Sequence, residues 1–102
     1  MSATLEVLSI KYDTLFRQDG HTIIFTQIGN SITDWDIIEP LEEISRQNYW
    51  HLEGECGFIG ELLGKDIKAV LREYEGTKEP NNAIFIINNI GDEDYYRIQV
   101  SF

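Results

Sequence analysis

The chain has 102 residues, and its apolar and aromatic fractions of 42% and 12% are sufficient for one core, so we take residues 1–102 as a single domain. It carries 18 Asp and Glu against 8 Lys and Arg, a formal net charge of −10 at pH 7. This charge disfavours direct binding to nucleic acid, which requires Lys and Arg at the phosphates, and docking on an anionic membrane, while it favours basic partners.

Two strands are expected in the first third of the chain. Residues 4–12 alternate and are rich in strand-forming side chains. Residues 21–28 are β-branched and aromatic, and turn-forming pairs flank them, Asp19-Gly20 before and Gly29-Asn30 after. We therefore expect these two segments to pair as a hairpin.

A helix is expected next, capped by Thr33 or Asp34 and extending towards Gln47, because apolar residues recur there at helical spacing: Ile37, Ile38, Leu41 and Ile44. Pro40 lacks a backbone donor, which is tolerated only in the first helical turn. The pattern therefore predicts that the regular helix begins only near Glu39.

The middle of the chain predicts a strand followed by a helix. Residues 49–59 have strand character, and Gly54 and Gly57 indicate a bulge or a bend within them. Residues 61–75 form the clearest helical pattern, which Gly76 would end. The apolar face of this helix would consist of Leu63, Ile67, Val70, Leu71 and Tyr74.

The C-terminal part predicts two more strands. Residues 83–89 contain a compact apolar run, and a turn around Gly91-Asp92 precedes the alternating residues 95–102. Together these segments predict an α+β fold, with a sheet of about five mostly antiparallel strands and two helices packed on one face.

The sequence predicts no enzyme. His21, His51 and Cys56 are its only histidines and cysteine, and no catalytic signature surrounds Cys56, which we interpret as a small, partly buried thiol in a bent strand. In an extended strand His51, Glu53 and Glu55 would stand about 7 Å apart, too wide to share a zinc ion. Neither a zinc-ligand motif nor a glycine-rich phosphate loop occurs, so we expect no metal and no cofactor.

The acids are unevenly distributed along the chain. Residues 34–55 hold seven acids against Arg46 alone, and residues 92–94 form a second acidic cluster. Aromatic residues lie within or beside both stretches, and aromatic anchors surrounded by carboxylates are typical of a surface that binds a basic protein. Each tryptophan, taken alone, is also compatible with the core. The expected partner-binding residues are Asp34, Trp35, Asp36, Glu39, Glu42, Glu43, Trp50, Glu53, Glu55, Asp92, Glu93, Asp94 and Tyr95.

The short acidic chain, with its stretches Asp34-Trp35-Asp36 and 92–96, resembles the small immunity proteins that protect bacteria from toxins, especially those of contact-dependent growth inhibition systems. The resemblance is one of overall character and transfers no single functional residue. It implies an antitoxin that binds a basic toxin, a nuclease above all, and covers its active or substrate-binding site. The alternative is a small-ligand-binding protein or an enzyme with a cleft between sheet and helices.

Compartment signals favour the cytoplasm. A single cysteine excludes an internal disulfide, which fits a reducing environment. Residues 1–10 lack the pattern of a signal peptide, and no apolar run approaches the ~20 residues that span a bilayer. We therefore expect a cytoplasmic protein that does not associate with membranes.

Overall fold

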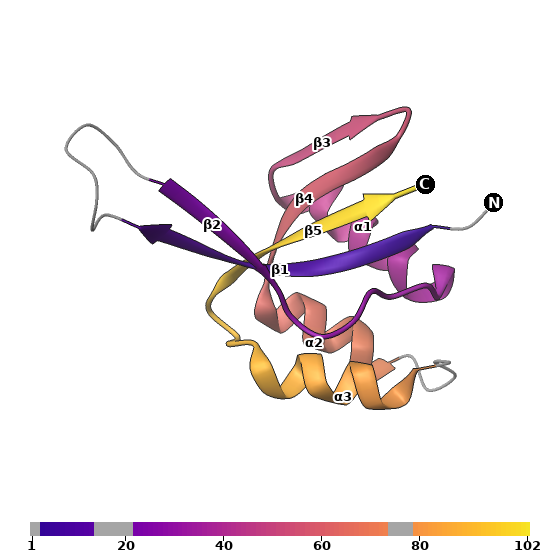
Figure 1. Cartoon of the computed structure of the whole chain (residues 1–102). Helices are drawn as coiled ribbons and strands as arrows, with labels where there is room; N and C mark the ends of the chain where they lie inside the picture. Colours follow the sequence, from indigo (N-terminus) through magenta and orange to yellow (C-terminus); the bar gives the residue numbers. More distant parts are fainter. Residues whose placement is uncertain (1–2, 14–21, 74–78) are drawn as a thin grey trace.

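A computed structural model describes residues 3–13, 22–73 and 79–102 (Figure 1). The α+β class predicted from the sequence is confirmed, with five strands in the described part of the chain. The elements in chain order are β1 (Thr4–Asp13), β2 (Thr22–Gln27), α1 (Trp35–Asn48), β3 (His51–Gly54), β4 (Gly57–Leu63), α2 (Gly64–Glu73), α3 (Pro80–Asn89) and β5 (Tyr95–Ser101).

The five strands form one antiparallel sheet in the order β2-β1-β5-β4-β3. Two hairpins, β1–β2 and β3–β4, therefore make up its two halves, and β5 joins them in the middle, as the yellow strand in Figure 1 shows. The hairpin expected between the first two strands is confirmed, with Leu8 opposite Gln27 and Tyr12 opposite Ile23.

The core lies between the sheet and the helices. Alternate residues of the three central strands point into it, and their partners come from all three helices. Since side chains alternate along a strand, the intervening residues lie on the opposite face, which no described helix covers and which we call the open face. The core residues with 0% exposure are Leu5, Ile38, Leu41, Leu62, Ile67, Ile86 and Ile98.

The segment expected as one strand over residues 49–59 is a hairpin, and the next helix begins at Gly64 rather than near Glu61. Of the bulge or bend expected at Gly54 and Gly57, the bend is confirmed, since the two glycines flank the turn of this hairpin. Burial in β4 alternates strictly, with Phe58 and Leu62 buried, so residues 57–63 follow a period of two rather than a helical period. Tyr74 and Gly76, expected at the end of the helix, lie outside the described residues.

The strand expected over residues 83–89 is wrong, because these residues belong to α3. Pro80 occupies the first turn of this helix, where its missing donor costs nothing. Ala83 and Ile86 are buried, while Ile84 and Phe85 are 56% and 51% exposed. The apolar run thus spans both sides of a helix, and the described part of the chain has three helices instead of the expected two.

Helix α1 begins at Trp35, so the expectation that it starts only near Glu39 is also wrong. Pro40 lies in its second turn and removes the donor that would have bonded to the Asp36 carbonyl. Asp36 is exposed and Pro40 is half-buried at the surface, where water can hydrate that carbonyl. The helix therefore continues through the proline to Asn48.

Candidate partner-binding surface

The outer side of α1 carries the most concentrated group of expected partner-binding residues. Asp36, Glu39 and Glu43 are exposed at helical spacing, and with Pro40 they line a depression of about 340 Å³. Trp35 precedes them on the same helix and is 46% exposed, so it is not a core residue. We call Trp35, Asp36, Glu39 and Glu43 the α1 acidic face.

Glu73 of α2 extends this acidic surface, although we did not predict it. A smaller hollow of about 180 Å³ is lined by Asp36 and Pro40 of α1 together with Val70 and Glu73 of α2. Residues 61–75 carry nearly balanced charges, so charge distribution alone does not indicate Glu73. One feature of the sequence does indicate Glu73. It follows the apolar Val70 by three residues, so on a helix it lies at the margin of the buried side of α2.

Two of the expected surface acids are buried. Glu42 is 2% exposed and Asp34 is 7% exposed, so the expectation that these two acids belong to a partner-binding surface is wrong. Asp34 precedes α1, and its backbone carbonyl accepts hydrogen bonds from the N–H groups of Ile37 and Ile38, each at 3.0 Å. These positions contribute to the start and the inner side of α1 rather than to a contact surface.

The Glu42 carboxylate is only partly compensated by hydrogen bonds. Its Oε1 atom lies 3.5 Å from Arg46 Nη2, while its buried Oε2 atom has no hydrogen-bond partner among the described residues. Burial raises the pKa of Glu42 above its ordinary value, although the positive charge of Arg46 opposes this shift. Because its folded-state pKa is raised, the ionised Glu42 destabilises the fold at neutral pH, and this penalty disappears as the pH falls through that pKa.

Glu42→Gln is therefore expected to raise the free energy of unfolding at neutral pH by about 1 kcal/mol, since it removes a poorly paired buried charge. The gain should shrink as the pH is lowered towards about 4, where Glu42 itself is neutral. Urea denaturation at both pH values measures this, with the exposed neighbour change Glu43→Gln as control. A variant less stable than the wild type at neutral pH would show that the pair with Arg46 outweighs burial.

Arg46 balances part of the acidic charge near the end of α1. Its Nη2 atom lies 2.6 Å from Glu53 Oε1, and its Nη1 atom lies 3.5 Å from Glu43 Oε2. The hydrogen bond from Arg46 lowers the pKa of Glu53, so this acid is charged at neutral pH and links β3 to α1. Glu55 is exposed in the turn between β3 and β4. Arg46 thus connects Glu42, Glu43 and Glu53 in one network of ion pairs that joins α1 to β3.

Trp50 lies away from this surface. It is 51% exposed and stands on the open face, where the Arg97 guanidinium is 5.5 Å from its ring and 4.3 Å from the ring of Phe25. The structure therefore separates the two tryptophans that the sequence places in one acidic stretch. Trp35 belongs to the helical layer and Trp50 to the sheet, and neither is a core residue.

The acidic cluster of residues 92–94 is also apart from the α1 acidic face. Asp92 forms an ion pair with Lys68 at 2.7 Å, which lowers the pKa of Asp92. The backbone carbonyls of Asp92 and Asp94 accept hydrogen bonds from the N–H groups of Lys65 and Gly64, at the start of α2. The other end of α2, at Glu73, adjoins Asp36. Asp92, Asp94 and the exposed Glu93 between them therefore lie at the far end of the helical layer.

Tyr95 joins this distant group. Its ring packs edge-on against Tyr49, with 6.2 Å between ring centroids, and Tyr49 donates a hydrogen bond of 2.5 Å to Asp66 of α2. This hydrogen bond raises the pKa of Tyr49 to about 12. Tyr95 itself is 54% exposed, so it is accessible for binding but lies remote from Trp35.

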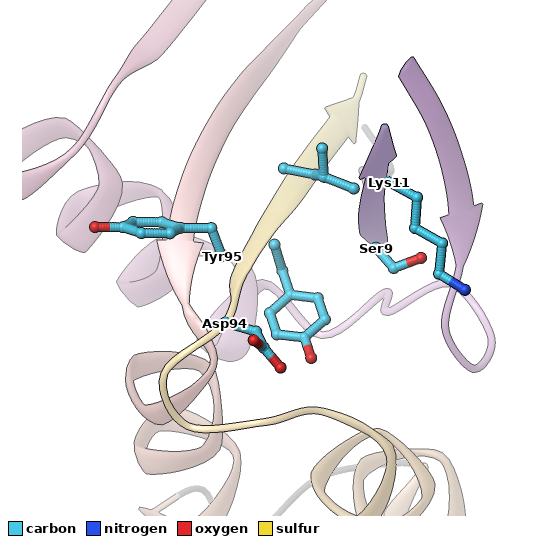
Figure 2. Close-up of a pocket in the computed structure, with 6 residues that line it drawn as sticks. Ser9, Lys11, Asp94 and Tyr95 are labelled. Carbon is cyan, nitrogen blue, oxygen red and sulfur yellow. The ribbon is translucent and has the colours of Figure 1, made fainter. Parts of the chain in front are cut away.

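A hollow of about 340 Å³ opens where β1 runs past the start of β5 (Figure 2). Figure 2 shows the Tyr95 side chain pointing away from β1. Lys11 and Asp94 supply one charge of each sign, and the lining contains neither histidine nor cysteine. The lining residues are Ser9, Ile10, Lys11, Asp94, Tyr95 and Tyr96.

The residues weighed for catalysis or metal binding are placed as follows. Cys56 is exposed in the turn between β3 and β4, which corrects the expectation of a partly buried thiol. The His51 ring stacks on Phe58, and its Nε2 atom is 4.0 Å from Glu53 Oε2. Within the described ranges no three side chains of His, Cys, Asp or Glu are grouped to hold a metal ion. His21 lies outside those ranges.

None of the helices in the described part of the chain combines the length and the apolar character needed to cross a membrane. Comparisons with protein-family models, with curated proteins and with solved structures gave no significant match. The function must therefore be inferred from the surface itself.

Proposed function

We propose that the protein neutralises a basic protein, a toxin nuclease above all, by laying the α1 acidic face over its phosphate-binding surface. The observation that carries this proposal is that two adjoining hollows share Asp36, one lined also by Glu39 and Glu43 and the other by Glu73, while the half-exposed Trp35 stands at the start of the same helix α1. A nuclease must attract phosphate, and the positive field that does so also attracts carboxylates. Such an inhibitor needs no catalytic group of its own, as is the case for the immunity proteins that the sequence resembles.

In this proposal the exposed acids and Trp35 contribute to binding in different ways. Exposed acids contribute mainly by accelerating encounter, and each adds about 1 kcal/mol or less to affinity. Trp35 offers an aromatic side chain that a partner can bury, and anchors of this kind contribute most of the energy at interfaces. The toxin acts on nucleic acid, so in this proposal both proteins meet in the cytoplasm.

The alternative of a ligand cleft between sheet and helices finds less support. That space is occupied by the core side chains, seven of which are 0% exposed. A small ligand would have to bind in a surface hollow such as that of Figure 2. We therefore retain the protein-binding function as the leading proposal.

The test begins with capture from a native extract on immobilised protein, at low and at moderate salt. The wild type should retain a basic protein in stoichiometric amount, and more of it at low salt. The eluted protein should have nuclease activity that one equivalent of the wild type abolishes. A captured protein whose activity is unchanged by the wild type would defeat the proposed function.

Glu39→Lys should then slow association with the captured protein about fivefold, which corresponds to about 1 kcal/mol, and should reduce its salt dependence. The matched control is Glu6→Lys, which makes the same charge change in β1, on the open face. Stopped-flow measurements at several salt concentrations compare the two variants. Equal effects of both would mean that only the net charge matters and that the α1 acidic face is not the contact surface.

A further inference from the structure

The edge strand β2 lacks the charges that usually protect a sheet edge. Residues 22–33 contain no Asp, Glu, Lys or Arg, in a chain of which 25% is charged. Exposed edge strands normally carry charged residues, because their unpaired backbone groups otherwise recruit another strand. The opposite edge, β3, follows this rule, since it has only four residues and includes Glu53, with Glu55 in the adjoining turn.

Strand β2 also exposes apolar side chains on both of its faces. Ile23, Ile24 and Phe25 follow one another and are 48%, 42% and 38% exposed. The pairing of β1 with β5 ends at Ser9, whereas its pairing with β2 continues to Asp13. The far half of the β1–β2 hairpin therefore extends beyond the rest of the sheet, as Figure 1 shows. A hairpin of two strands is only marginally stable in water unless another surface covers it.

The backbone of β2 has its pairing groups available on the outer side. The Ile28 N–H donates to the Val7 carbonyl at 2.8 Å, which fixes the side that faces β1. Backbone groups alternate along a strand, so the N–H and C=O groups of Ile23, Phe25 and Gln27 point away from β1. No strand of the described chain lies beyond them.

The sequence of β2 is complementary to itself in antiparallel orientation. When Ile23-Ile24-Phe25 is placed against a second copy with Ile24 at the centre, Ile24 faces Ile24, and Ile23 faces Phe25. Pairs of aromatic with β-branched residues are favourable cross-strand pairs. A two-fold interface requires this kind of self-complementarity, whereas an unrelated partner strand does not.

We propose that β2 is a homodimerisation edge, at which two copies join their sheets antiparallel about a two-fold axis at Ile24. The net charge of −10 on each copy opposes association, but this arrangement limits the repulsion by keeping the acidic β3 edges far apart. Four strand spacings of about 4.8 Å separate β2 from β3, so the β3 edges of the two copies lie at least ~38 Å apart, well beyond the Debye length of ~8 Å. The dimer goes beyond the proposed function and leaves the α1 acidic face uncovered in both copies.

Sedimentation equilibrium tests the dimer. The wild type should self-associate, and more tightly at higher salt because salt screens the repulsion between acidic copies. Ile24→Glu should weaken self-association at least tenfold, since it places two carboxylates beside each other at the axis. Ile24→Lys should do the same, and a mixture of both variants should associate again as a heterodimer. Leu52→Glu, at the β3 edge, should leave the dimer intact.

Cysteine cross-linking tests the register in a Cys56→Ser background. Ile24→Cys should form a disulfide-linked dimer, because residues at a non-hydrogen-bonded pair have Cα atoms about 4.5 Å apart. Thr26→Cys should not, because its two copies would be displaced by ~13 Å along the strands.

Either of two results would overturn the proposal. One is a wild type that remains monomeric at every protein and salt concentration. The other is a dimer that is indifferent to Ile24→Glu. If the wild type is monomeric and Ile24→Glu abolishes capture of the basic protein, β2 binds that protein instead of a second copy. The heterodimer restored by Ile24→Glu and Ile24→Lys would exclude misfolding as the cause of dissociation.

Discussion

Gly64→Ala is expected to destabilise the protein by about 2–4 kcal/mol, because the new methyl group has no room at the junction of β4 and α2. A Cβ atom at position 64 would overlap the Gly91 carbonyl oxygen and would lie 2.8 Å from the Gly91 carbonyl carbon. The backbone of residues 91–94 cannot move away easily, because hydrogen bonds hold it in place. The Gly64 N–H donates to the Asp94 carbonyl at 2.9 Å, and the Gly91 N–H donates to the Tyr96 hydroxyl at 2.8 Å.

Gly54→Ala is the matched control for this change. A Cβ atom at position 54 meets nothing within 4 Å, and the backbone there is not in the left-handed region. Its effect should be small, or slightly stabilising through the unfolded state. Urea denaturation followed by circular dichroism compares the two variants. Equal stabilities would mean that the 91–94 loop yields without cost, and that α2 does not depend on it for its first hydrogen bonds.

Asn82→Asp should cost about 2–3 kcal/mol at neutral pH, because it places a carboxylate against a backbone carbonyl. Asn82 is 9% exposed and connects α3 to the segment between β2 and α1. Its Nδ2 donates to the Asn30 carbonyl at 2.9 Å, and its Oδ1 accepts from the Asn30 N–H at 2.8 Å. An aspartate keeps the acceptor but loses the donor.

This loss should depend on pH in a defined direction. The carbonyl of Asn30 raises the pKa of the introduced carboxyl in the folded state, so the penalty is full above that pKa and declines as the pH falls through it. Asn81→Asp is the control, since Asn81 is exposed in the first turn of α3, where a negative charge is favourable. Thermal unfolding of both variants at several pH values measures the difference. A deficit for Asn82→Asp that is constant with pH would contradict this explanation.

The sequence predicted the fold correctly where a residue pattern is compatible with only one type of secondary structure. Residues 4–12 and 95–102 alternate, and the structure has strands Thr4–Asp13 and Tyr95–Ser101. The run Ile84-Phe85-Ile86-Ile87 suits a buried strand and a helix equally well. These residues form a helix that begins at Pro80 and buries Ile86 in the core. Because this burial depends on the tertiary structure, the sequence alone does not predict it.

The sequence predicted several of the acids that form the candidate surface, but it did not predict which acids are buried or which helices meet there. The exposed acids Glu39 and Glu43 lie on the helix predicted for their segment, and Asp36 lies in the turn by which the helix begins earlier than predicted. Glu42 follows the same pattern, yet the packing of α1 turns it inward, and no rule of charge distribution distinguishes it from Glu43. Glu73 reaches the surface of α1 only through the contact between two helices, which a single sequence does not specify.

The central position of β5 has a consequence for synthesis on the ribosome. The two hairpins have no strand pairing with each other, and β5, the last strand of the chain, joins them at the middle of the sheet. Until residues 95–101 leave the exit tunnel, neither hairpin can bury its apolar face against a completed sheet. Folding of the nascent chain into the complete sheet is therefore deferred until β5 has emerged, and up to that moment both hairpins leave apolar side chains uncovered.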